Sequence, residues 1–171
     1  AENACEAAEK LGIDSGILKV LQPDEDATDY EFMPDVFVSG LRYRGRAAEK
    51  LVYRLKKWTS WKQFDTCPFE DLRDPGRLHV DPAGNVHICQ GISIGNMFGK
   101  PLKEILNEFD PDKHPITGPL LKGGPAELVK NYRITHNNKY CDACHLCYEA
   151  RRQLLKRFPN ELTPKGVYGI D

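Results

Sequence analysis

Six cysteines constrain this chain more than any other feature of its sequence: Cys5, Cys67, Cys89, Cys141, Cys144 and Cys147. The last three stand within one short run, a spacing that lets two or three thiolates meet at one metal centre. A framework of three disulfides is typical of short secreted chains that cannot build a core. This chain has 171 residues, enough for a core, and shows no export signal. We therefore expect a metal or cluster site, with Cys5 as a small buried core residue outside it.

Composition and charge exclude several classes of function. The 24 Lys and Arg residues nearly balance the 25 Asp and Glu residues, which leaves a net charge of −1. Such a balance gives no electrostatic footprint for nucleic acid or for an anionic membrane surface. No apolar run of about 18 residues is present, so we expect no transmembrane helix. We expect a cytoplasmic protein with neither nucleic acid nor membrane as a partner.

The hydrophobic pattern predicts an α+β fold of short elements. Helices are expected at 2–11, 46–58, 101–109, 126–132 and 146–158. Strands are expected at 16–21 and 35–40, with an acidic loop at 23–35 between them. A short antiparallel hairpin is predicted at 78–81 and 86–89, because Pro82 and Gly84 suit a turn. Cys89 then ends a strand, and basic residues including Arg151 follow Cys147 toward the end of the last helix.

The order of these motifs resembles a known cluster-binding domain. Cys67 precedes a Gly-x4-Cys hairpin strand (Gly84 to Cys89), an Ile94-Gly95-Asn96 segment and the Cys-x2-Cys-x2-Cys run. This set, over roughly residues 64–150, resembles the auxiliary-cluster domain, called SPASM or in its shorter form twitch, of many radical S-adenosylmethionine enzymes. Upstream, Arg44-Gly45-Arg46-Ala47 is similar to a segment that often precedes this domain.

The resemblance implies a fold, a cofactor and a ligand set. Residues 1–60 would be the last strand and helix elements of a truncated partial α/β barrel, or a linker. Residues 61–171 would be the SPASM or twitch domain, a hairpin with several helices around a [4Fe–4S] cluster. Cys67 and Cys89 would ligate with two of Cys141, Cys144 and Cys147; we favour Cys141 and Cys144, although the sequence does not choose. The cluster would serve electron transfer or substrate binding.

Two departures from the family bear on activity. The chain lacks the Cys-x3-Cys-x2-Cys loop that binds the catalytic cluster in that family, and it is too short for the barrel. S-adenosylmethionine would therefore bind only in the missing barrel of a parent chain. We expect a fragment of a radical S-adenosylmethionine oxidoreductase or maturase that is inactive by itself. Its partners would be that barrel and a peptide, protein or small-molecule substrate.

Three alternatives stay open on the sequence. A structural zinc ion would use the same cysteines. Cys141-Asp-Ala-Cys144-His145 matches the attachment pattern of a c-type haem, which leaves the other cysteines of the set unexplained. A non-catalytic module could present a peptide along a groove lined by Phe98, Phe109 and Tyr140. His87 and His145 stand beside cysteines, and we expect them to support the site rather than to ligate.

Overall fold

The computed structural model describes residues 2–13, 15, 17–22 and 36–170. This part of the chain mixes helices with small sheets, as expected for the α+β class. The helices are α1 (Glu2–Lys10), α2 (Arg46–Lys50), α3 (Leu102–Glu108), α4 (Thr117–Tyr132) and α5 (Ala143–Leu154), with short 3-10 turns η2 (Val52–Arg54), η3 (Trp61–Gln63) and η4 (Lys165–Tyr168). The strands are β1 (Ile17–Val20), β2 (Val36–Ser39), β3 (Thr59–Ser60), β4 (His79–Val80), β5 (Asn85–Cys89), β6 (Ile92–Asn96) and β7 (Lys139–Tyr140).

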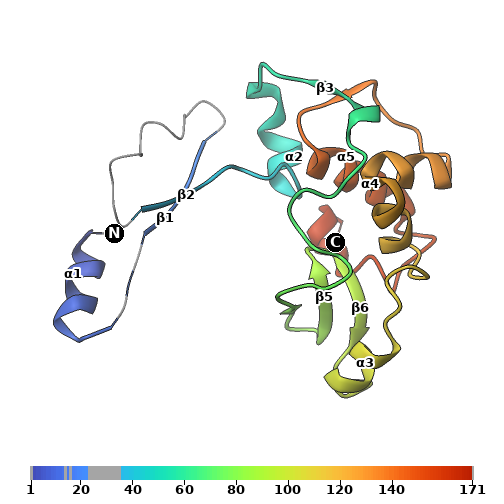
Figure 1. The fold of residues 1–171 in the computed structure, drawn as a ribbon. Helices are drawn as coiled ribbons and strands as arrows, with labels where there is room; N and C mark the ends of the chain where they lie inside the picture. The colour runs from blue at the N-terminus through green and yellow to red at the C-terminus, as the bar shows by residue number, and fades with distance from the viewer. Residues whose placement is uncertain (1, 14, 16, 23–35, 171) are drawn as a thin grey trace.

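The N-terminal elements stand apart from the rest of the chain (Figure 1). β1 and β2 fall where the sequence predicts strands and pair in parallel as a two-stranded sheet. At the end of α1, Leu11 is 73% and Ile13 is 59% exposed. Cys5 is half-buried rather than buried, because α1 lies outside the hydrophobic core. The acidic loop predicted at 23–35 lies outside the described residues.

The predicted hairpin is confirmed and belongs to a three-stranded antiparallel sheet in the order β4-β5-β6. Its turn uses Gly84 at a φ of 81°, and Asp81 accepts hydrogen bonds from the backbone N–H groups of Ala83 and Asn85. The sequence pattern does not predict β6. A tight turn through Gly91, at a φ of 78°, leads into it, and a Cβ there would lie 2.7 Å from the Tyr168 hydroxyl oxygen. Only glycine fits that position.

The helices differ from the predicted ones mainly at their ends. The expected helix 46–58 is shorter, because Leu51, with φ −120°, leaves the helical region and η2 follows. The predicted helix 126–132 is the second half of α4. Gly123 and Gly124 interrupt α4 just before Pro125, and the first half of α4 extends back to Thr117. This break places the backbone of α4 against the segment that precedes Cys67.

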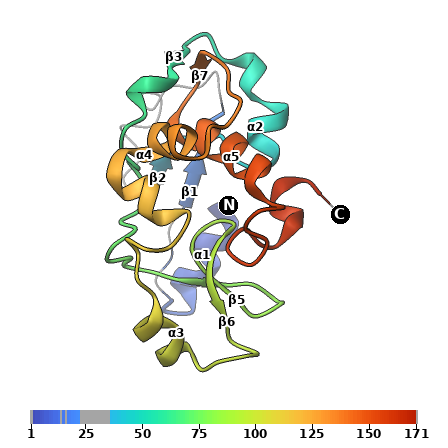
Figure 2. The ribbon, with the colours of Figure 1, turned by 90° about the vertical axis from the view of Figure 1, so that its right-hand side faces the viewer.

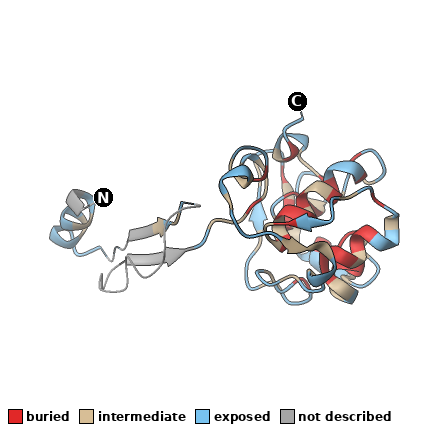
Figure 3. Ribbon diagram, turned by 90° about the horizontal axis from the view of Figure 1, so that it is seen from above, coloured by how far each residue is buried: buried red, intermediate tan, exposed pale blue. Residues whose placement is uncertain are grey.

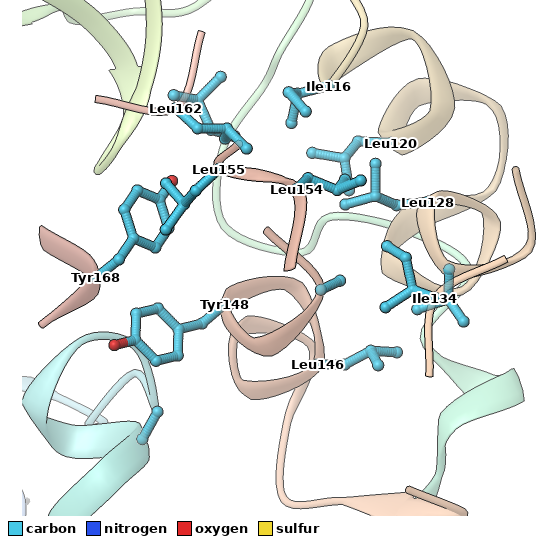
Figure 4. Close-up of a cluster of buried hydrophobic side chains, with 14 of the residues drawn as sticks. Ile116, Leu120, Leu128, Ile134, Leu146, Tyr148, Leu154, Leu155, Leu162 and Tyr168 are labelled. Atoms are coloured by element: carbon cyan, nitrogen blue, oxygen red, sulfur yellow. The ribbon is translucent and has the colours of Figure 1, made fainter. Parts of the chain in front are cut away.

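A continuous core joins α4 and α5 to the elements around them (Figure 4). Leu128 and Leu146 are fully buried between these helices, and the rings of Tyr148 and Tyr168 stack with centroids 5.9 Å apart. Figure 3 shows that the buried residues gather in the compact C-terminal part of the chain. The burial of these apolar side chains stabilises the compact part of the chain, which carries the site described below.

In the compact part, α4 and α5 lie at one end of the β4-β5-β6 sheet (Figure 2). α4 and α5 lie side by side, and the hairpin of β5 and β6 lies below them in Figure 2. β3 and β7 form a separate two-stranded antiparallel pair. Within the described residues, no helix is long and apolar enough to cross a membrane.

A candidate metal centre lined by four cysteines

Four cysteines line one cavity in the compact part of the chain. They are Cys67, Cys89, Cys144 and Cys147, and none of them forms a disulfide. The space in the cavity that the centre of a water-sized sphere can occupy is about 20 Å³. Its walls are otherwise largely apolar, with two arginines and one glutamate: Arg44, Pro68, Phe69, Glu70, Leu72, Ile92, Leu120, Pro125, Ala143 and Arg151.

The helical geometry of α5 decides which cysteines of the run face the cavity. Cys144 and Cys147 are three positions apart in α5, so their side chains lie on one face of the helix. Cys141 precedes the N-cap residue Asp142, whose side chain accepts a hydrogen bond of 2.7 Å from the His145 N–H. Cys141 therefore lies before α5, and the three-residue spacing that places Cys144 and Cys147 on one helical face does not include it. The structure brings Cys144 and Cys147 to the same cavity as Cys67 and Cys89, whereas Cys141, which the sequence favours as a ligand together with Cys144, does not line it.

Cys141 is held in a separate chain of hydrogen bonds. Its Sγ lies 3.2 Å from Nδ1 of His145, and Nε2 of His145 lies 3.1 Å from Oε1 of Glu149. A carboxylate can only accept, so Nε2 of the imidazole carries the proton, and in the neutral ring Nδ1 accepts from the Cys141 thiol. Burial, together with the charge of Asp142, raises the pKa of Cys141 to about 12. Cys141 is thus a neutral thiol with a hydrogen-bond partner outside the cavity.

The loop that carries Cys67 is fixed by the break in α4. The Ala126 N–H donates to the Phe64 carbonyl over 3.0 Å. Gly124, at a φ of 58°, approaches the same segment so closely that a Cβ would lie 2.4 Å from the backbone nitrogen of Thr66. The glycine and proline in the middle of α4 therefore hold the loop beside α4 and set the position of Cys67.

Two arginines bring positive charge to the cavity. Arg44 donates from Nη1 to Sγ of Cys89 over 3.2 Å. Arg151 is only 2% exposed, and it donates to the carbonyl groups of Cys147 and Gln90 and to the Tyr168 hydroxyl. No carboxylate in the described part of the chain forms an ion pair with either guanidinium. The acid on the cavity wall, Glu70, is instead bound by Arg42 at 3.0 Å and Arg77 at 3.7 Å.

The thiols of the cavity respond both to burial and to these charges. Burial raises the pKa of Cys67 and Cys144, and it raises the pKa of Cys147 to about 11. The charge of Asp142 adds to this rise in pKa at Cys144 and the charge of Arg44 works against it, and the charge of Arg151 works against the rise at Cys147. At neutral pH Cys67, Cys144 and Cys147 are therefore protonated in the absence of a metal, and metal binding would release their protons.

The sulfurs do not converge on one point. Among the described residues, no group of three or more His, Cys, Asp or Glu side chains is placed to hold a single metal ion.

The histidines and aromatic residues singled out in the sequence lie outside the cavity wall. Nε2 of His87 lies 3.1 Å from Oδ2 of Asp81, and Nδ1 of His87 is buried without a partner in the described structure. Tyr140 packs edge-on against the His145 ring, 5.0 Å between centroids. Phe98 is 80% exposed beyond β6. None of these four side chains lines the cavity.

Arg151 was not predicted to be part of the site. The sequence pattern places this residue in a basic group near the end of the last helix, where cations interact favourably with the helix dipole. The available signal was its spacing, since Arg151 stands four positions after Cys147 and so shares a helical face with it. Comparison with family models, with curated proteins and with solved structures found no match to this chain.

Proposed function

We propose that the chain is an auxiliary [4Fe–4S] cluster-binding domain of a radical S-adenosylmethionine enzyme, with Cys67, Cys89, Cys144 and Cys147 as ligands. The observation that carries this proposal is the meeting of these cysteines at one cavity. They come from a loop, the end of a strand and one face of a helix. Residues so far apart in sequence meet at one apolar cavity only through the tertiary fold. Iron in a cubane prefers such soft thiolate donors, one on each iron.

The buried charge of Arg151 also supports an anionic occupant. A guanidinium removed from water is costly unless an opposite charge accompanies it. Arg151 has carbonyl and hydroxyl partners and no carboxylate among the described residues. Arg151 donates to the carbonyl of Cys147, one helical turn earlier, and Cys147 is one of the four cysteines that line the cavity. Thiolates bound to a metal cluster would supply the missing negative charge.

The residues of this chain would hold the cluster and shield it from water, and the cluster would supply one-electron transfer. The apolar side chains of Leu72, Ile92 and Leu120 line the cavity and limit its hydration. The loop from Cys67 to Glu70 is shared between this cavity and an outer groove that includes Asp65 and Leu121. A substrate, whether peptide, protein or small molecule, would approach the cluster along that groove.

The N-terminal elements suggest where the catalytic part of the enzyme would lie. Parallel sheets are normally wide and covered by helices on both faces, whereas within the described residues β1 and β2 form a parallel sheet of two strands. We therefore assign residues 1–60 to the end of a larger parallel α/β barrel of the parent protein. S-adenosylmethionine and the catalytic cluster would bind in that barrel, because this chain has no Cys-x3-Cys-x2-Cys loop. We place the enzyme in the cytoplasm.

Anaerobic reconstitution with iron and sulfide tests the proposal. We expect about four iron and four sulfide ions per chain with broad visible absorption, and the loss of both in Cys89→Ala. Cys5→Ala is the matched control, because Cys5 lies on α1 away from the cavity and its loss should leave iron and sulfide unchanged. A colourless protein with stoichiometric zinc would favour a structural zinc site instead. Full iron and sulfide in Cys89→Ala would refute the assignment.

A further inference from the structure

The electrostatics of the cavity go beyond what ligation requires. A ligand set needs four thiolates, yet two guanidinium groups also line this cavity. Arg44 reaches one ligand sulfur directly, with Nη1 3.2 Å from Sγ of Cys89. Arg151 is 2% exposed and so keeps its charge in a region of low dielectric, where electrostatic interactions are strongest.

The charges of these arginines are not neutralised by neighbouring acids. Glu70 is the carboxylate on the cavity wall, and Arg42 and Arg77 bind it from outside that wall. Within the described chain, neither Arg44 nor Arg151 has a carboxylate at ion-pair distance. The two guanidinium groups therefore bring positive charge to the Cys89 and Cys147 side of the cavity, whereas Asp142 acts in the opposite sense at Cys144 and Glu70 does so at Cys67.

A positive field acts unequally on the two redox states of a cluster. Four thiolates give the oxidised centre a net negative charge, and a one-electron reductant such as dithionite adds one further negative charge to it. Nearby cations stabilise the more negative state, and a hydrogen bond to a ligand sulfur withdraws electron density from that sulfur. Both effects raise the reduction potential.

We propose that Arg44 and Arg151 set the reduction potential of the bound cluster, with Arg44 acting through the sulfur of Cys89. This inference rests on the proposed function, since it needs the cluster to be present. Arg44 and Arg151 are thus positioning residues, and neither is a ligand. Arg44 is the sharper test, because it contacts a ligand sulfur directly and is only partly buried.

The experiment uses the full chain, reconstituted anaerobically and titrated with dithionite while the electron paramagnetic resonance signal of the reduced cluster is followed. Arg44→Gln removes the charge and should shift the midpoint potential to a more negative value. Arg44→Lys keeps the charge and should shift it less. Arg46→Gln is the matched control, since Arg46 is exposed two positions away and lies outside the cavity wall. Its potential should equal that of the wild type.

A second readout tests the contact with Cys89 without depending on the potential. Loss of the hydrogen bond to Sγ should shift an iron–thiolate stretching band in the resonance Raman spectrum of Arg44→Gln, and Arg46→Gln should leave that band in place. An Arg44→Gln protein with a full cluster, an unchanged potential and an unchanged band would overturn the role of Arg44. A wild-type chain that takes up no iron and sulfide would overturn the proposed function itself, which is a different result.

Discussion

Sγ of Cys141 lies 3.2 Å from Nδ1 of His145, and this contact separates the fifth cysteine of the motif from the four that line the cavity. Glu149 fixes the ring by accepting from Nε2 at 3.1 Å, and the Asp142 side chain accepts from the His145 N–H. The imidazole is thereby held in one orientation. In that orientation its free nitrogen faces the Cys141 thiol.

We expect Cys141→Ala to retain the cluster and Cys147→Ala to lose it. Cys147 faces the cavity from α5, whereas Cys141 has its partner outside the cavity. Iron and sulfide content after anaerobic reconstitution measures the difference. The two variants differ from the wild type by the same chemical change, so each serves as the control for the other. An equal loss of iron in both would place Cys141 among the ligands.

A methyl group at residue 124 should destabilise the fold. Gly124 has a φ of 58°, and a Cβ would lie 2.4 Å from the Thr66 nitrogen and 2.6 Å from the Phe64 carbonyl oxygen. Strain from the left-handed backbone and from overpacking should lower the free energy of unfolding in Gly124→Ala by roughly 2 to 5 kcal/mol. Chemical denaturation measures this loss. Gly76→Ala is the control with a nearly unchanged free energy of unfolding, because a Cβ at residue 76 meets no atom within 4 Å.

Removal of the buried Tyr168 hydroxyl should lower the free energy of unfolding while the ring keeps its packing. The Tyr168 hydroxyl donates to the Gly91 carbonyl over 2.6 Å and accepts from Nη1 of Arg151 over 3.2 Å. Tyr168→Phe leaves both groups without this partner, so we expect the free energy of unfolding to fall by about 1–3 kcal/mol. Tyr53→Phe is the matched control, since Tyr53 is 77% exposed. Equal stability of the two variants would contradict the role assigned to the buried hydroxyl.

Stability should also fall in mild acid because of His114. Burial lowers the pKa of His114 below its ordinary value of 6.5, although its bond to the Ser93 carbonyl opposes this shift. Nδ1 accepts from the Thr117 N–H over 3.2 Å, so a proton there breaks a native contact. Below pH 6.5 the unfolded chain binds more protons than the folded chain, and the free energy of unfolding decreases until the pH passes the lowered pKa.

Denaturation across pH 5 to 8 measures this dependence. His114→Gln should flatten the curve between the folded and unfolded pKa values, because the group that titrates differently in the two states is gone. His79→Gln is the control, since His79 lies exposed on β4. A wild-type slope that persists in His114→Gln would assign the acid sensitivity to another group.

Much of the fold follows from local sequence signals. The hairpin around Gly84 was predicted because its turn residues act within a few positions of one another. The strand β6 was not predicted, because its partner β5 and the close approach of Tyr168 to Gly91 supply the reason for its turn. Likewise the sequence pattern predicts only the second half of α4 and not the break at Gly123 and Gly124. The break is explained by the loop before Cys67, which lies against Gly124 but far away along the chain.

The sequence by itself determined that several thiols would lie close together, because three cysteines within seven residues stay near one another in any local conformation. It could not choose among Cys141, Cys144 and Cys147, since the choice depends on where α5 begins. The tertiary structure decided which of them line the cavity, because the helix turns Cys144 and Cys147 to one face and His145 holds Cys141 at another place. The spacing of Arg151 from Cys147 was a signal in the sequence, but only the fold could bring Arg44 to the cavity, because its charge acts through distance in space and not through position in the chain.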